Sequence, residues 1–218
     1  MKNRKLKVHS IFVSLQGEGP LTGTPSVFLR LSGCNLRCSF CDTPEALNGG
    51  SEMPVDEIVE ILSYKKENAS NLVITGGEPL LQIAPLEELL NAIEGIFPTV
   101  EIETNGTLFP PDISWINFNV SPKTSNSGIP RERAIKPEIL RKFADLKSIF
   151  KFVVEKEEDI KEIKEIMDPL GIDQQRIYLM PMASTPEELR NSAPFVASLA
   201  IKYGFRYSDR LHIRLSIP

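Results

Sequence analysis

Short apolar segments alternate with amphipathic segments over most of this chain, and this alternation limits the folds open to it. The apolar segments are rich in Ile, Val and Phe and end at Gly, Pro, Asn or Ser, as β-strands do. They predict strands at 7–15, 27–31, 72–75, 100–103, 115–120, 149–154, 177–180 and 212–215. The amphipathic segments predict helices at 55–66, 86–96 and 160–170, with two more beginning at Pro137 and Pro186, whereas 43–53 is expected to be a loop.

From about Pro54 onward, helices and strands follow one another, with one helix missing between the strands at 100–103 and 115–120. Such alternation requires crossover connections, which are right-handed and join parallel strands. We therefore expect an α/β protein with a mainly parallel sheet, open or curled into a partial barrel. The 218 residues fit a single domain spanning 1–218, because no repeat, low-complexity tract or long linker divides them.

Polar motifs directly follow four of the predicted strands. They are Gly76-Gly77-Glu78-Pro79, Thr104-Asn105-Gly106, Ser121-Pro122-Lys123 and Pro181-Met182. The carboxyl ends of parallel strands meet at one edge of a sheet or barrel, where loops and helix N-termini converge and ligands bind. The sequence therefore predicts one ligand site built from several loops.

The three cysteines of the chain, Cys34, Cys38 and Cys41, fall within eight residues. An odd number so closely spaced does not form a disulfide framework, and in a reducing compartment it indicates metal or redox chemistry. A structural zinc site needs a fourth ligand, and the two histidines, His9 and His212, lie at opposite ends of the chain. An iron–sulfur cluster with three thiolate ligands leaves one iron open, which favours a cluster over zinc or unligated thiols.

The charge and hydropathy of the chain exclude several classes of function. Lys and Arg number 25 against 29 Asp and Glu, and the net charge of −4 offers no global positive field to a nucleic acid. No segment approaches the ~18–20 apolar residues of a membrane span. The basic and then apolar N-terminus lacks the cleavage site of a signal peptide. We expect a cytoplasmic protein with no nucleic-acid and no membrane partner.

The CX3CX2C spacing, followed downstream by Gly76-Gly77-Glu78-Pro79, resembles the radical S-adenosylmethionine (SAM) superfamily. In that superfamily the open iron of a [4Fe-4S] cluster chelates the amino and carboxylate groups of SAM. The two glycines allow the backbone to approach the cofactor amine closely, and Glu78 is expected to add a compensating negative charge.

Within the superfamily, the chain is similar to the 7-carboxy-7-deazaguanine synthase family over nearly its whole length. The similarity includes Gln16-Gly17-Glu18-Gly19, Gly23, Phe28, Arg30, Gly33 to Cys38, Cys41-Asp42-Thr43, and the motifs ETNG, SPK and KFVV. The resemblance implies a partial (β/α) barrel of the radical SAM type that forms a homodimer. It implies a carbon–nitrogen lyase of queuosine and 7-deazapurine biosynthesis, which converts 6-carboxy-5,6,7,8-tetrahydropterin to 7-carboxy-7-deazaguanine. The implied cofactors are a [4Fe-4S] cluster, SAM and Mg²⁺, with an external electron donor such as a flavodoxin.

By position, the resemblance also implies the site residues. The cluster is held by Cys34, Cys38 and Cys41, and Mg²⁺ by Thr43. The substrate is bound by Leu15, Gln16, Gly17, Arg30, Thr75 and Pro218. SAM is bound by Gly77, Ser121, Pro122, Lys123, Met180, Pro181, Met182 and Ala183. No catalytic side chain is implied beyond the cofactor, the cluster loop is 33–43, and a C-terminal strand and tail at 210–218 close the site.

The residue types suit these roles. Gln16 offers the donor and acceptor that a pterin edge requires, and the Arg30 fork suits the pterin carboxylate. A hydroxyl oxygen such as that of Thr43 suits a hard ion, and the carboxylate of Pro218 suits the guanidine-like edge of a pterin.

Simpler interpretations remain open for several of these residues. They are an outward-facing strand residue for Arg30, a loop or cap residue for Thr43, a solvated side chain for Lys123, and core packing for Met180 and Met182. The roles of Glu18, His212 and Arg214 are left open. Two other functions also compete. A glycyl-radical activase shares CX3CX2C but acts on a protein backbone, and an iron–sulfur electron carrier would neither bind nor cleave SAM.

Overall fold

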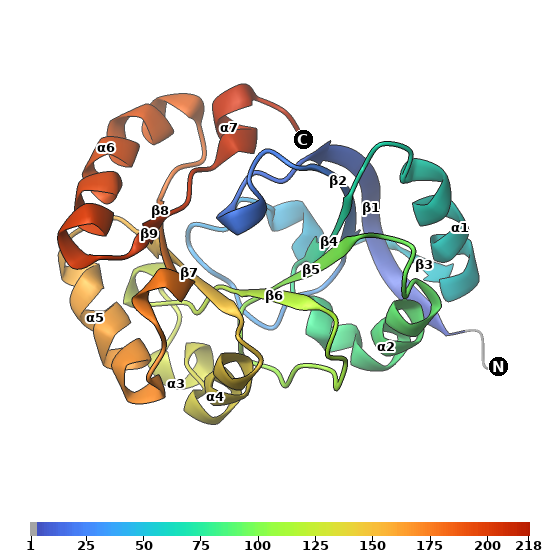
Figure 1. Cartoon of the computed structure of the whole chain (residues 1–218), viewed down its shortest axis with the longest axis horizontal. Helices are drawn as coiled ribbons and strands as arrows, with labels where there is room; N and C mark the ends of the chain where they lie inside the picture. The colour runs from blue at the N-terminus through green and yellow to red at the C-terminus, as the bar shows by residue number, and fades with distance from the viewer. Residues whose placement is uncertain (1–3) are drawn as a thin grey trace.

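The computed structural model describes residues 4–218, in which a curved sheet is surrounded by helices (Figure 1). The nine strands lie in the order β3-β1-β2-β4-β5-β6-β7-β8-β9. They are β1 Lys5–Leu15, β2 Pro25–Leu31, β3 Ser51–Pro54, β4 Asn71–Gly76, β5 Thr99–Thr104, β6 Asn117–Val120, β7 Ile149–Val154, β8 Ile177–Pro181 and β9 Arg206–Tyr207. Strand β1 pairs antiparallel with β2 and β3, and every pairing from β2 to β9 is parallel. The fold is therefore the mainly parallel α/β partial barrel that the alternation of segments predicted.

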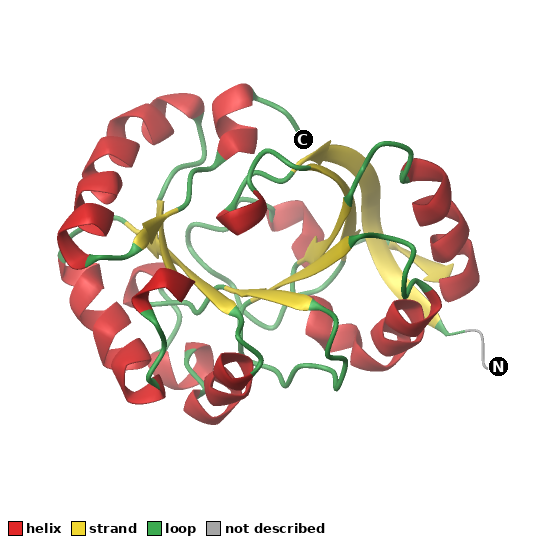
Figure 2. Cartoon of the chain, in the orientation of Figure 1, coloured by secondary structure: helices red, strands yellow, loops and turns green. Residues whose placement is uncertain are grey.

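Most helices lie on the outer side of the curved sheet (Figure 2). They are α1 Val55–Lys65, α2 Ile83–Ala92, α3 Arg131–Ala134, α4 Pro137–Asp145, α5 Glu158–Met167, α6 Pro186–Tyr203 and α7 Leu211–Leu215. Helices α4 and α6 begin at Pro137 and Pro186 as predicted, because proline suits the first turn of a helix. Within the described residues, no helix separates β5 from β6, as the sequence also predicted.

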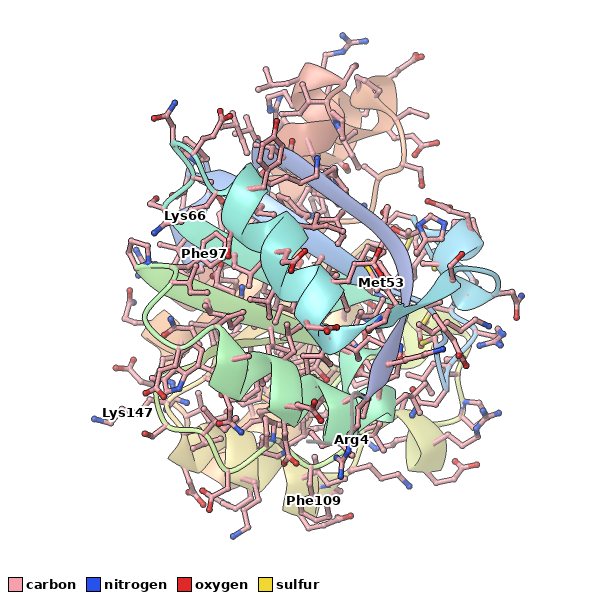
Figure 3. All side chains as sticks on the ribbon, turned by 90° about the vertical axis from the view of Figure 1, so that its right-hand side faces the viewer. Arg4, Met53, Lys66, Phe97, Phe109 and Lys147 are labelled. Carbon is pink, nitrogen blue, oxygen red and sulfur yellow. The ribbon has the colours of Figure 1, made fainter. Side chains whose placement is uncertain are left out.

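Helices α1 and α2 lie side by side, and their C-terminal flanks also meet (Figure 3). There, the Lys66 ammonium lies 5.9 Å from the centroid of the Phe97 ring. Within residues 4–218, no helix has the length and apolarity that crossing a membrane requires.

The two faces of the strands differ in chemistry, because side chains alternate between the faces of a strand. In β7, Phe150 and Phe152 are fully buried in the apolar core, whereas Lys151 between them borders the interior cavity. In β5, Ile102 packs in the same core while Glu103 borders the cavity. The outer face therefore holds the helices on the sheet, and the inner face is left free for polar side chains.

Two segments differ from the sequence-based prediction. The predicted loop at 43–53 contains most of the edge strand β3, which pairs with β1. The predicted strand at 212–215 was wrong, because these residues form helix α7. Five residues that alternate between polar and apolar fit either structure, and the Leu211 N–H donates to the Gly17 carbonyl (2.9 Å) instead of joining a sheet. The helix ends at Leu215, and Ser216 directly after it has a φ of 54°, in the left-handed region. A helix and tail, not a strand and tail, thus lie beside the site.

Candidate functional site

One cavity of about 580 Å³ opens inside the curved sheet, at the carboxyl ends of the parallel strands. Among the predicted site residues, its lining includes Leu15, Gln16, Gly17, Arg30, Cys34, Cys38, Cys41, Thr43, Thr75, Gly77, Ser121, Lys123, Met180 and Pro218. Four predicted SAM-binding residues are not part of that lining, namely Pro122, Pro181, Met182 and Ala183. Pro122, Pro181 and Ala183 are buried behind it. Three of the four strand-end motifs therefore contribute to one site, whereas Pro181-Met182 does not line it. The volume of the cavity is that of a ligand pocket.

The three cysteines are free thiols that are partly buried and border the cavity. Burial raises the pKa of Cys34 and of Cys38, and the neighbouring thiols of Cys34 and Cys41 raise that of Cys38 further. Thiolates at these positions therefore need positive charge beside them.

The spacing of these thiols tests which centre they fit. Among residues 4–218, the one group of three metal-ligand types whose atoms all lie within 4.8 Å of one another is Glu18, Asp42 and His212. The three thiols do not form such a group, although two sulfurs on one zinc ion are only about 3.8 Å apart for Zn–S bonds of about 2.3 Å. At least one pair of the thiols is therefore farther apart than the ligands of a single zinc ion, which favours a larger centre such as an iron–sulfur cluster.

Hydrogen bonds from polar side chains fix the position of the cysteine loop. The Asn35 amide donates to the Thr107 hydroxyl (2.8 Å) and accepts from the Asn105 amide (2.9 Å). The Arg37 guanidinium donates to the carbonyls of Cys34 and Leu36, each at 2.7 Å. The motif that follows β5 therefore holds the loop that carries the thiols.

The segment Gly76 to Pro79 lies directly against the cysteine loop. The Glu78 N–H donates to the Gly33 carbonyl at 2.8 Å, and the Gly77 N–H donates to the Leu31 carbonyl at 3.1 Å. A Cβ on Gly77 would lie 2.1 Å from the Gly33 oxygen and 2.9 Å from the Cβ of Cys34. Only glycine permits this approach.

The structure gives Glu78 a different role from the expected charge beside a cofactor amine. Its side chain is fully buried and is not part of the cavity lining. Its carboxylate accepts from the Leu80 N–H (3.0 Å), the Thr104 hydroxyl (2.8 Å) and the Asn105 N–H (2.7 Å). Burial raises the pKa of Glu78. Glu78 thus links the carboxyl ends of β4 and β5 by hydrogen bonds outside the cavity lining.

Arg30 points into the cavity and not outward from the sheet. Its guanidinium donates to the Thr43 hydroxyl (2.6 Å) and lies 5.6 Å from the centroid of the Phe12 ring. Phe12 stacks on Phe28, with ring centroids 5.0 Å apart and 4° between their planes. A flat aromatic wall and a planar cation therefore adjoin each other on one side of the cavity.

The C-terminal residues of the chain contact the C-terminal end of β1 and the segment that follows it. The Ser14 hydroxyl donates to the Pro218 carbonyl (2.7 Å), which fixes the last residue at the cavity. Gly17 has no room for a side chain, because a Cβ there would lie 2.2 Å from Nδ1 of His212. Burial lowers the pKa of His212, which also borders the cavity.

Two predicted residues already hold partners within the protein. The Gln16 amide donates to Glu101 (2.9 Å) and accepts from the Glu18 N–H (3.2 Å). The Lys123 ammonium donates to the Ser121 hydroxyl (2.8 Å), and both residues border the cavity.

The sequence analysis missed a group of charged residues on the cavity wall. Glu103, Lys151 and Arg210 border the cavity together with Glu18, whose role was left open. Arg210 binds both Glu18 and Asp42, so a guanidinium already compensates two carboxylates of the Glu18, Asp42 and His212 group. The signal was a lysine within the buried strand IFKFVV, which contrasts with the apolar residues on both sides of it.

Comparison with known proteins gives consistent results. The model of the radical SAM superfamily matches residues 29–116. A 7-carboxy-7-deazaguanine synthase from Hyperthermus butylicus is 41% identical over 227 residues, covering 99% of this chain and 95% of that protein. A synthase of the same name from Pyrobaculum aerophilum is 40% identical, covering 96% of this chain and 94% of that protein. The crystal structure of QueE from Escherichia coli is similar with a TM-score of 0.76 and 25% identity, over 95% of each chain.

Proposed function

The chain belongs to the family of 7-carboxy-7-deazaguanine synthases within the radical SAM superfamily, and we propose how its cavity performs that family's reaction. The reaction converts 6-carboxy-5,6,7,8-tetrahydropterin to 7-carboxy-7-deazaguanine with loss of ammonia. The observation that supports this proposal most is that the three thiols and the Arg30 wall border the same cavity. A cluster and a pterin carboxylate can therefore be held within one enclosed volume.

The cysteine side of the cavity holds the cofactors in this proposal. Cys34, Cys38 and Cys41 are the cluster ligands, and their spread supports this assignment. When bound, the cluster and SAM would supply the radical chemistry that removes hydrogen from C6 of the pterin. The SAM-facing residues are Gly77, Ser121, Lys123 and Met180, which border the cavity, with Pro122, Pro181, Met182 and Ala183 supporting them from outside the lining.

The Arg30 side of the cavity holds the substrate. The Arg30 guanidinium binds the pterin carboxylate in a bidentate manner, and the stacked Phe12 and Phe28 rings offer a flat apolar surface beside it. Pro218 contacts the guanidine-like edge, and the Ser14 hydroxyl, which donates to the Pro218 main-chain oxygen, holds it in place. Leu15, Gln16, Gly17 and Thr75 complete the wall and exclude water from the reacting atoms.

We assign the Mg²⁺ site to Thr43. Its hydroxyl oxygen suits a hard ion, which needs few protein ligands when waters and substrate oxygens supply the others. In the structure that oxygen accepts from Arg30 (2.6 Å). An ion bound at Thr43 would place a second positive charge beside the Arg30 guanidinium, and this favours a turn of Arg30 toward the pterin carboxylate.

The working enzyme in this proposal is a cytoplasmic homodimer that receives electrons from an external donor such as a flavodoxin. The dimer and the donor follow from the family resemblance. Sedimentation and reduction assays with purified flavodoxin test them separately from the chemistry.

Turnover tests the proposed reaction. The enzyme is reconstituted anaerobically with iron and sulfide and incubated with SAM, a reductant, Mg²⁺ and 6-carboxytetrahydropterin, and the products are identified by mass spectrometry. We expect 7-carboxy-7-deazaguanine. SAM cleavage without this product would favour another radical SAM activity, such as that of a glycyl-radical activase. A cluster without SAM cleavage would favour an electron carrier, and failure to bind a cluster would favour zinc.

A further inference from the structure

A buried lysine connects two carboxylates on the cavity wall. The Lys151 ammonium lies 2.9 Å from Oε2 of Glu18 and 2.6 Å from Oε2 of Glu103. The Lys151 side chain is 1% exposed, whereas those of Glu18 and Glu103 are 17% and 18% exposed. All three residues border the cavity, and the carboxylates are the members that solvent reaches most. The Lys151 ammonium therefore contacts the two carboxylates on their buried side, and their exposed side faces the cavity.

The second oxygen of each carboxylate is also held. Oε1 of Glu103 accepts from the Asn119 amide (2.9 Å), and Oε1 of Glu18 accepts from Nε of Arg210 (3.3 Å). Lys151, Asn119 and Arg210, from three different segments of the chain, thus fix the orientation of the pair. Gly19 follows Glu18 directly with a φ of 71°, a left-handed conformation that favours glycine.

Lys151 is the only cation bound to Glu103 among the described residues. Glu101 is the nearest other acid on the same strand. It accepts from the amides of Gln16, Asn71 and Asn119, and within residues 4–218 it has no cationic partner. Burial raises the pKa of Glu103, Glu18 and Glu101 raise it further, and Lys151 lowers it without cancelling the rise. At Glu18, Lys151 and Arg210 together overcome burial and lower the pKa. Removing Lys151 would leave Glu103 without a cationic partner, beside the carboxylates of Glu18 and Glu101.

We propose that Lys151 is a positioning residue for the substrate, which holds the Glu18 and Glu103 carboxylates as a pair of hydrogen-bond acceptors on the cavity wall. The inference rests on the proposed function. A tetrahydropterin carries N–H donors on its ring and on its exocyclic amine, and ionised carboxylates are purely acceptors. Three other titratable or charged residues lie near Glu18. They are Arg210 and His212 from the C-terminal segment and Asp42 from the cysteine loop.

The test is Lys151→Met in the reconstituted holoenzyme. Steady-state kcat and KM for 6-carboxytetrahydropterin are measured from pH 6 to 9, and pterin binding is measured with SAM present and no reductant. We expect KM and Kd at pH 7 to rise roughly 10- to 100-fold. Both should recover as the pH rises, because the carboxylates then lose the proton that they share without Lys151. Iron content and SAM binding should match those of the wild type.

Two further variants keep the test decisive. Lys202→Met removes an exposed ion pair with Glu157 and should leave KM and the pH profile unchanged. Lys151→Met/Glu103→Gln removes one charge of each sign, so it should fold even where the single variant does not. It should keep the raised KM and lose the pH dependence.

The outcomes separate the two proposals. If the wild type makes 7-carboxy-7-deazaguanine and Lys151→Met does so with the same KM and pH profile, the inference about Lys151 fails alone. If Lys151→Met does not fold and the double variant binds pterin as the wild type does, the inference also fails. If the wild type makes no product, the proposed function fails and this inference fails with it.

Discussion

Gly77→Ala tests the contact on which the cluster site depends. The added Cβ would lie 2.1 Å from the Gly33 oxygen, 2.6 Å from the Gly33 carbonyl carbon and 2.9 Å from the Cβ of Cys34. The first two of these neighbours are backbone atoms, so no side-chain rotation relieves the clash. The substitution therefore has to separate the Gly76 to Pro79 segment from the cysteine loop. The Glu78 N–H to Gly33 carbonyl bond (2.8 Å) joins these segments and should break.

The size of the effect follows from these two losses. Overpacking costs about 1–3 kcal/mol and a lost hydrogen bond about 1 kcal/mol, so unfolding should become easier by about 2–4 kcal/mol. For a chain of this size, that corresponds to a fall in Tm of roughly 4–16 °C. Because the clash also reaches Cys34, we expect reconstituted Gly77→Ala to contain well under the wild-type amount of iron and sulfide.

Gly171→Ala provides the matched control. Gly171 has a φ of 63°, but a Cβ there would meet no atom within 4 Å, so the variant is strained without a clash. It should lose about 1 kcal/mol of stability and keep full iron content and turnover. The measurements are thermal unfolding before reconstitution and iron and sulfide analysis after it. Wild-type Tm and iron content in Gly77→Ala would refute the reasoning.

Three further predictions address other parts of the site. Cys34→Ala should abolish cluster binding and SAM cleavage, measured by iron analysis and 5′-deoxyadenosine formation; a full cluster would show that Cys34 is not a ligand. Arg30→Ala should keep the cluster and raise the pterin KM, and an unchanged KM would show that the substrate carboxylate lies elsewhere. Burial lowers the pKa of His212, so the unfolded chain binds more protons below about pH 6.5 and stability falls as the pH falls through that range. His212→Gln should flatten this fall in urea unfolding from pH 8 to 5, and an identical pH slope in both proteins would contradict it.

The strands that run through the core were predictable from the sequence, and the short segments at the edges of the fold were not. The predicted strand at 149–154 is β7 exactly as bounded, because its buried face and flanking polar residues give a strong pattern. Strand β3 was missed because its sequence SEMP is polar and lies at an edge, where pairing with β1 and not burial defines it. Helix α7 was predicted as a strand because its position is set by contact with Gly17, far away in the sequence.

The candidate site was partly predictable for a similar reason. Motifs at strand ends share the cavity because parallel strands end at the same edge, and Arg30, Thr75 and Lys123 all border it. The charged residues on the cavity wall depend on the register between strands, since Glu103 lies opposite Asn119 in the β5–β6 pairing. Such pairings are not visible in local sequence. The role of Glu78 was likewise missed, because its partners come from the end of a neighbouring strand.

An anaerobic crystal structure of the reconstituted enzyme with SAM, Mg²⁺ and 6-carboxytetrahydropterin tests the central claim most directly. The account predicts a cluster on Cys34, Cys38 and Cys41, with the pterin carboxylate within hydrogen-bond distance of Arg30 and the Glu18 and Glu103 carboxylates facing the pterin ring. A pterin bound outside this cavity, or bound within it with its carboxylate away from Arg30, would contradict the account.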